Sequence, residues 1–113
     1  MTTDEIEEEI DELKTSLDDG VKELALAKAT YERDSDMKSP TLSITKMKYG
    51  GSDSAKKTLA EADSSYTDFL TGDKFNNALN FHTLDARRRG AMQRLEILRS
   101  LLSFNKTRTD QDV

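Results

Sequence analysis

Apolar residues recur at alternating steps of four and three residues from Ile6 to Tyr31. The two columns of this heptad pattern are Ile10, Leu17, Leu24 and Tyr31, and Ile6, Leu13, Gly20 and Ala27. This spacing places the apolar side chains on one face of an α-helix that packs against a partner helix. A helix of this length is marginal in water by itself, so the pattern predicts a second apolar stripe that covers the first.

A second stretch with the same period runs from Asp73 to Phe104. The two stretches are similar in length, about 50 Å each at ~1.5 Å per residue. Two equal apolar stripes joined by a connector predict an antiparallel helical hairpin. The large residues that we expect in its seam are Ile6, Ile10, Leu13, Leu17, Leu24, Tyr31, Leu84, Leu95, Leu98 and Leu102.

Breaks in the pattern divide the chain into its expected elements. Pro40 disfavours helical angles in the residue before it, and the Gly50-Gly51 pair is a strong break. We therefore expect an all-α, antiparallel helical hairpin in one domain covering residues 1–113. Its expected elements are a helix at 4–37, a connector at 38–53, a short helix at 54–71, a helix at 73–104 and a polar tail at 105–113.

Composition narrows the possible functions. The 113 residues contain no Cys and a single His, so thiolate chemistry and histidine metal sites are excluded. A hairpin also lacks the concave site that catalysis needs, so we expect no enzymatic activity, no cofactor and no small-molecule substrate. Without a long apolar run, the chain is expected to be soluble and cytoplasmic, in the host cytoplasm if phage-encoded.

The net charge of −5 is unevenly distributed. Residues 1–36 hold 13 acidic and 4 basic residues, and residues 81–108 hold 7 basic and 2 acidic residues. The acidic run at the start of the first helix, capped by Thr3 or Asp4, complements the helix dipole. Its alternative interpretation is an acidic docking or DNA-mimicking face. Opposite charge on the two long stretches favours their pairing.

Basic residues form two candidate nucleic-acid sites. Lys46, Lys48 and Tyr49 precede the Gly-Gly break and combine two charges for phosphate with an aromatic ring for base stacking. The alternative is a solvated loop with Tyr49 packed against a helix end. Arg87, Arg89 and Arg94, with Arg99, could form a basic stripe for phosphate. Arg88 occupies a seam position, where it could pair with an acid near residues 17–23 and set the helix register.

Several apolar residues lie outside the predicted seam. They include Leu26, Met92, Ile97, Leu101 and Phe104. One hairpin cannot cover them all, so the pattern indicates a homo-oligomer, or packing by the short middle helix.

The layout resembles the small helical recombination mediators of T-even phages, which load a recombinase onto single-stranded DNA. The resemblance rests on the acidic amphipathic first helix and on the tip Lys46-Met47-Lys48-Tyr49-Gly50-Gly51. It also rests on the helix around Tyr66 and on the stretch from Ser100 to Phe104. It implies a ring-like homo-oligomer that binds single-stranded DNA, with Lys46 and Lys48 as the matching basic residues.

The sequence therefore leaves three functions open. The first is a DNA recombination or replication accessory that binds single-stranded DNA, a recombinase, or both. The second is an acidic helical inhibitor or adaptor that binds a protein partner through residues such as Glu7, Glu8, Glu9 and Asp11. The third is a structural coiled-coil scaffold component.

Overall fold

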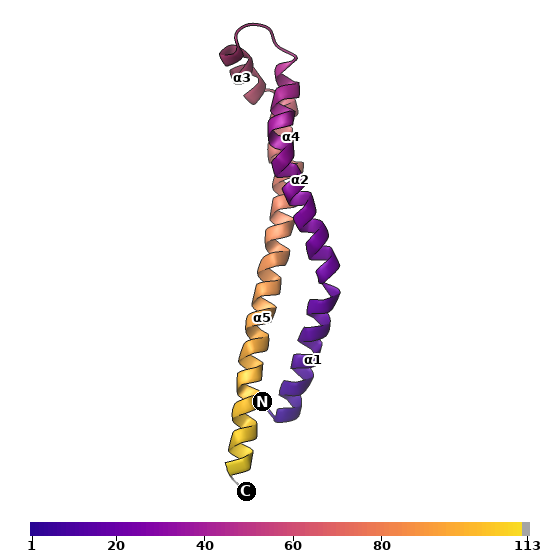
Figure 1. The fold of residues 1–113 in the computed structure, drawn as a ribbon, viewed down its shortest axis with the longest axis vertical. Coiled ribbons are helices and arrows are strands. Elements are labelled where there is room, and N and C mark those ends of the chain that lie inside the picture. Colours follow the sequence, from indigo (N-terminus) through magenta and orange to yellow (C-terminus); the bar gives the residue numbers. More distant parts are fainter. Residues whose placement is uncertain (112–113) are drawn as a thin grey trace. The chain divides into compact units, whose positions relative to one another are not determined.

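Five helices and no strand make up the described part of the chain, residues 1–111 of this computed structural model (Figure 1). The helices are α1 (Thr3–Asp19), α2 (Val21–Lys46), α3 (Asp53–Glu61), α4 (Ser64–Thr71) and α5 (Asp73–Gln111). The all-α class expected from the heptad pattern is confirmed.

The contacts divide the chain into two compact units, a division that the hydrophobic pattern did not indicate. Unit 1 comprises Met1–Leu24 and Leu84–Val113, and unit 2 comprises Ala25–Thr83. Both α2 and α5 cross a boundary between the units, so two helical connections join them.

The core of unit 1 is the predicted seam. Ile6 and Ile10 of α1 form a buried cluster with Leu95 and Leu98 of α5, and Ile6 and Leu98 are almost completely buried. Leu13, Leu17 and Leu102 pack against this cluster, whereas Leu24 and Leu84 are half-buried. Glu9 pairs with Arg94, and Leu17 accepts a hydrogen bond from Arg88, so the two segments run antiparallel.

The first helix begins one residue earlier than expected. Its N-cap is Thr2, whose Oγ1 accepts from the backbone N–H of Glu5 at 3.2 Å, while the Glu5 carboxylate reaches back to Thr2. This reciprocal pair is a capping box, and the sequence Thr-x-x-Glu at residues 2–5 is its signal. The cap expected at Thr3 or Asp4 was therefore wrong.

Unit 2 pairs the rest of α2 with the start of α5. Tyr31 stacks on Phe81 with ring centroids 5.1 Å apart, which is the seam position expected for Tyr31. The Asn77 amide donates to the buried carboxylate of Asp34 at 2.7 Å. Because residues 31 and 34 contact residues 81 and 77, these segments also run antiparallel.

The predicted end of the first long helix was wrong. A break at Gly20 divides it into α1 and α2, and α2 then continues through Pro40 to Lys46 rather than ending at residue 37. Proline removes one helical N–H, but residues 35–40 are all exposed, so the carbonyl that loses its partner can bond water. Buried Asp34 and Thr45 hold α2 on both sides of the proline.

Two further boundaries differ from the expectation. The predicted helix at 54–71 is two helices, because α3 ends at its C-cap Ala62 and Asp63 then caps α4. The helix predicted to end at residue 104 continues to Gln111, so the expected tail is helical as far as the description reaches. In this added part of α5, Lys106 Nζ lies 3.7 Å from Glu7 Oε1 of α1.

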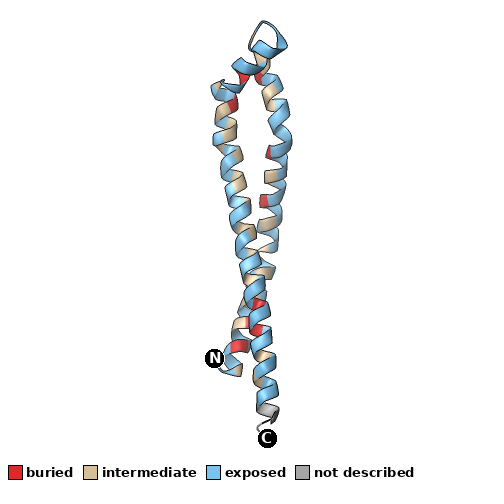
Figure 2. Cartoon of the chain, turned by 90° about the vertical axis from the view of Figure 1, so that its left-hand side faces the viewer, coloured by how far each residue is buried: buried red, intermediate tan, exposed pale blue. Residues whose placement is uncertain are grey.

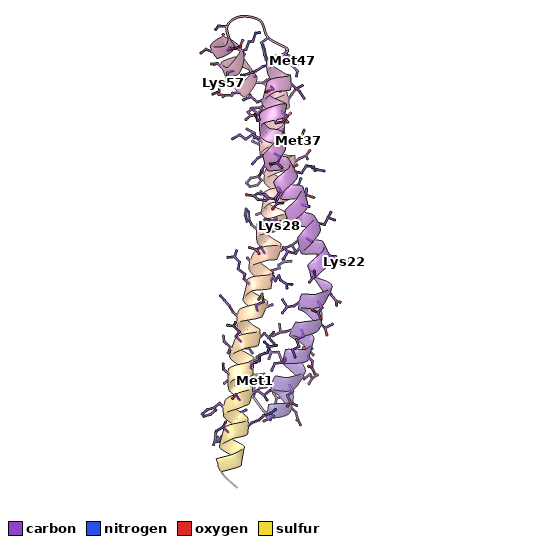
Figure 3. All side chains as sticks on the ribbon, in the orientation of Figure 1. Met1, Lys22, Lys28, Met37, Met47 and Lys57 are labelled. Atoms are coloured by element: carbon purple, nitrogen blue, oxygen red, sulfur yellow. The ribbon has the colours of Figure 1, made fainter. Side chains whose placement is uncertain are left out.

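Exposed residues dominate both units, as the pale blue positions in Figure 2 show. Several of these residues are apolar. In unit 2, Met47 is 84% exposed and Met37 is 42% exposed (Figure 3). In unit 1, Ile97, Leu101 and Phe104 are 54%, 40% and 63% exposed. The helical pairing thus leaves apolar side chains in water, as the pattern had indicated.

Candidate functional site

The predicted nucleic-acid tip lies at the end of α2 and is engaged within unit 2. Lys48 Nζ lies 2.6 Å from Ser65 Oγ and 3.5 Å from Asp63 Oδ1. The hydroxyl of half-buried Tyr49 donates to the other carboxylate oxygen of Asp63. Lys46 is half-buried and has no side-chain partner among the described residues. Two of the three predicted tip residues therefore bind the start of α4.

Asp63 is the centre of this tip. It is the N-cap of α4 and accepts from the backbone N–H of Ser65 at 2.8 Å, and its side chain is only 13% exposed. The hydrogen bond from Tyr49 and the bond from the Ser65 N–H lower the pKa of Asp63 to about 2. The same hydrogen bond raises the pKa of Tyr49. The geometry matches the alternative interpretation, in which Tyr49 packs against a helix end.

The predicted arginine stripe lies on α5 in unit 1 and is partly neutralised. Arg94 forms two bonds with Glu9, at 2.9 and 3.2 Å, and Arg89 bonds Asp85 at 2.8 Å. The hydrogen bond from Arg94 also lowers the pKa of Glu9. Arg87 is exposed and has no partner among the described side chains.

Arg88 acts differently from the expectation. Its Nη1 donates to the backbone carbonyl of Leu17 at 3.0 Å, so the predicted pairing with an acid near residues 17–23 was wrong. Leu17 lies in the last turn of α1, where carbonyl groups lack their usual helical partners. A cation there also complements the negative end of the helix dipole. Arg88 thus caps α1 from across the seam.

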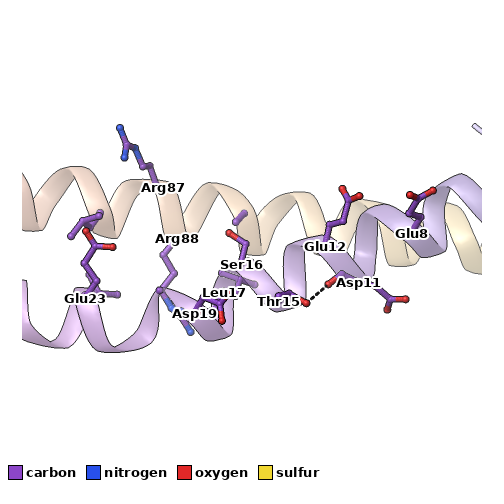
Figure 4. Close-up of a pocket in the computed structure, with 14 residues that line it drawn as sticks. Glu8, Asp11, Glu12, Thr15, Ser16, Leu17, Asp19, Glu23, Arg87 and Arg88 are labelled. Carbon is purple, nitrogen blue, oxygen red and sulfur yellow. Dashed lines mark hydrogen bonds between the residues drawn. The ribbon is translucent and has the colours of Figure 1, made fainter.

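A groove of about 1110 Å³ lies in unit 1, beside the junction of α1 and α2. Its apolar lining consists of half-buried side chains from both segments, Leu17, Leu24, Leu84 and Ala91. Its charged lining consists of Glu8, Asp11, Glu12, Asp19 and Glu23, together with Arg87 and Arg88. Figure 4 shows Glu8, Glu12 and Glu23 pointing the same way from α1 and α2.

The carboxylates of this acidic groove carry unpaired charge as far as the described side chains extend. None of the five has an ion-pair partner among the side chains that the structure describes, in contrast to the nearby Glu7 and Glu9. A surface that combines apolar side chains with unpaired negative charge suits a helix that is apolar on one face and basic on its flanks. The acidic run is visible in the sequence, whereas the groove is not, because the groove depends on how α5 packs.

Other kinds of site are not found in the described part of the chain. Among the side chains of residues 1–108, no group of three or more histidine or acidic residues could hold a metal ion. No helix in this range is both long enough and apolar enough to cross a membrane. Comparison with protein-family models finds no match to this chain, and comparisons with curated proteins and with solved structures also find none.

Proposed function

We propose that this chain is a non-enzymatic protein-interaction module whose acidic groove binds a basic amphipathic helix. The observation that carries this proposal is that an apolar-lined groove is bordered by five carboxylates, none of which has an ion-pair partner among the described side chains. A bound helix would lay its apolar side chains on Leu17, Leu24 and Leu84 and its Lys or Arg side chains against the carboxylates.

The charge of the groove supports a basic partner over nucleic acid. Phosphate binding requires unpaired cations, yet Lys48, Arg89 and Arg94 are all engaged by carboxylates of this chain. If these cations turned to bind phosphate, the carboxylates of Asp63, Asp85 and Glu9 would be left beside the nucleic acid. Repulsion between these like charges disfavours nucleic-acid binding.

A peptide titration tests this proposal. The probe is a fluorescent 18-residue helix with a leucine stripe flanked by arginines, added to the full-length chain in 50 mM and 500 mM NaCl. We expect micromolar binding that weakens with salt, because exposed charge pairs are screened. Replacing Glu12 and Glu23 with lysine should weaken binding about tenfold, which corresponds to about 1.4 kcal/mol.

The matched control replaces Glu32 and Asp36, which are exposed residues of unit 2, with lysine. The net charge changes by the same amount, but the groove is untouched, so binding should remain near the wild-type value. An equal loss of peptide affinity in the two double variants would mean that binding depends on net charge alone. Such a result, or no binding at 50 mM NaCl, would contradict the proposal.

Single-stranded DNA is the second candidate ligand, as the resemblance to phage recombination mediators implies. The observation that favours it is the set of exposed guanidiniums of Arg87 and Arg99, which have no ion-pair partner among the described side chains. Anisotropy of a labelled oligo-dT at ~50 mM salt separates the two candidates. Micromolar binding that is lost in the Arg87→Ala, Arg99→Ala variant would favour DNA over the groove proposal.

A further inference from the structure

The charges along the acidic groove are unevenly distributed. Because α1 and α5 run antiparallel, the start of α1 lies beside the middle of α5, and the end of α1 lies beside Arg87 and Arg88. Figure 4 shows Arg87 and Glu23 at one end of the groove and Glu8 and Glu12 at the other. The helical path from Glu8 to Glu23 is about 22 Å long at ~1.5 Å per residue. The groove is therefore long enough for its two ends to meet different parts of a bound helix.

The end of the groove at Glu8 carries only negative charge. Its charged lining consists of Glu8, Asp11 and Glu12. No cation lines this end among the described side chains. Arg94 of α5 is held by both carboxylate oxygens of Glu9, so its charge is already neutralised. This end therefore attracts cations of a partner.

The end of the groove at Glu23 carries charges of both signs. Asp19 and Glu23 line it from α1 and α2, and Arg87 and Arg88 line it from α5. Arg88 is half-buried and donates to the carbonyl of Leu17. Arg87 is exposed and forms no hydrogen bond or ion pair with a described side chain. Two acids and two bases leave this end formally neutral, whereas three acids and no base line the other end.

A free cation at one end gives the groove a direction. A helix with cations along its whole length would place some of them beside Arg87, and like charges there weaken binding. A helix with cations in one half and acidic side chains in the other satisfies both ends. The reversed orientation of the same helix is disfavoured, because it would set the acidic half beside Glu8 and Glu12. Lys14 and Lys22 of the same stretch do not line the groove, so this selection depends on Arg87.

We infer that Arg87 sets the direction in which a partner helix lies in the acidic groove. This inference rests on the proposed function and adds that the partner is charge-polarised. Its basic half lies at Glu8 and Glu12, and an acidic side chain of its other half pairs with Arg87. An exposed ion pair contributes little affinity. Arg87 therefore acts on the choice of partner and on its orientation, whereas the carboxylates and the apolar lining supply the attraction.

Two peptides that differ in the charge of one half test the role of Arg87. The uniform peptide is the arginine-flanked helix of 18 residues, and in the polarised peptide glutamates replace the arginines of one half. Fluorescence anisotropy in 50 mM NaCl gives the two dissociation constants, and their ratio, uniform over polarised, measures the preference for a polarised partner. Arg87→Glu should lower this ratio about fivefold from the wild-type value, because an attraction becomes a repulsion.

Arg99→Glu is the matched control. Arg99 is exposed on α5, forms no ion pair with a described side chain and lies outside the groove lining. The net charge changes by the same amount, so the ratio should stay at the wild-type value. Far-UV circular dichroism should show wild-type helicity for both variants, because both replaced side chains are exposed. If Arg87→Glu loses helicity, Arg87→Gln takes its place, and a smaller fall in the ratio is expected.

A spin label reports the direction of the bound helix. A nitroxide is attached to the basic end of the polarised peptide, and line broadening is measured for the backbone amides of the isotope-labelled chain. In the wild type the broadening should be strongest at residues 8–12. In Arg87→Glu it should be similar at residues 8–12 and 19–23, because both ends of the groove are then negative.

Three outcomes would overturn the inference. One is an unchanged ratio in Arg87→Glu, and another is an equal fall in Arg99→Glu. The third is equal broadening at the two ends of the wild-type groove. The peptides still bind in all three cases, so the proposed function stands and only the role of Arg87 is wrong. If neither peptide binds the wild type, the proposed function fails and the inference fails with it.

Discussion

The hydrogen bond between Asn77 and Asp34 allows a quantitative test of the helix pairing in unit 2. The Asp34 side chain is only 6% exposed, and its second partner, Arg33, lies 3.4 Å away with a side chain that is 68% exposed. Asn77→Ala removes the shorter bond, at 2.7 Å, and leaves the buried carboxylate with the weaker partner. Hydrogen bonds to charged groups contribute about 1.5–3 kcal/mol, so we take about 2 kcal/mol for this one.

The neighbouring residue provides the matched control. Asn76 is exposed, and Asn76→Ala makes the same change in the same helix. Alanine is the better helix former by about 0.5 kcal/mol, so Asn76→Ala should stabilise slightly and Asn77→Ala should destabilise by about 1.5 kcal/mol. The helix propensity cancels in the comparison, and the difference of about 2 kcal/mol isolates the bond.

Urea unfolding followed by circular dichroism at 222 nm measures this difference. A double-mutant cycle with Asp34→Ala extends the test, because Asn77→Ala should cost little once the carboxylate is absent. Equal stabilities of the two asparagine variants, or a coupling energy within 0.5 kcal/mol of zero, would refute the reasoning.

Three further predictions concern other parts of the fold. The pKa of Asp63 lies near 2, below its ordinary 3.8, so its bonds stabilise the fold above pH 3.8 and are lost toward pH 2. Melting temperatures from pH 6 to pH 2 should therefore fall less in Asp63→Asn than in the wild type. An added Cβ at Gly72 would lie 2.7 Å from the Asp68 carbonyl oxygen, whereas Gly90 has open space. Gly72→Ala should therefore lower the melting temperature, and Gly90→Ala should stabilise by about 1 kcal/mol in urea unfolding. Leu98→Ala should cost about 2–5 kcal/mol in the same assay, because Leu98 is completely buried.

Local signals in the sequence were sufficient to predict the all-α class and the residues of the seam in unit 1. The alternation of four and three residues places Ile6 and Ile10 against Leu95 and Leu98, because a buried helix face must repeat with the period of the helix. The cap at Ser52 could be recognised in the same way, since Ser just before a helix accepts from the first backbone N–H groups.

Chain breaks and side-chain partners depended on the tertiary structure. Pro40 predicted a helix end, but packing on both sides of the proline carries α2 through it, and packing of this kind outweighs a local preference of about 3 kcal/mol. Asp63 and Tyr49 are 14 residues apart, so the bond that occupies the predicted DNA tip is invisible in any local pattern.

The acidic groove shows most clearly what the sequence determined and what the tertiary structure decided. Its carboxylates follow from residues 8–23 alone, and their number predicted an acidic face. Which acids of α1 and α2 are paired was decided by the packing of α5. It brings Arg94 to Glu9 and Lys106 to Glu7, whereas no described side chain forms an ion pair with Glu12 or Glu23 of the groove. Composition sets how many charges a helix carries, whereas the distances between helices determine which charges neutralise one another and which remain for a partner.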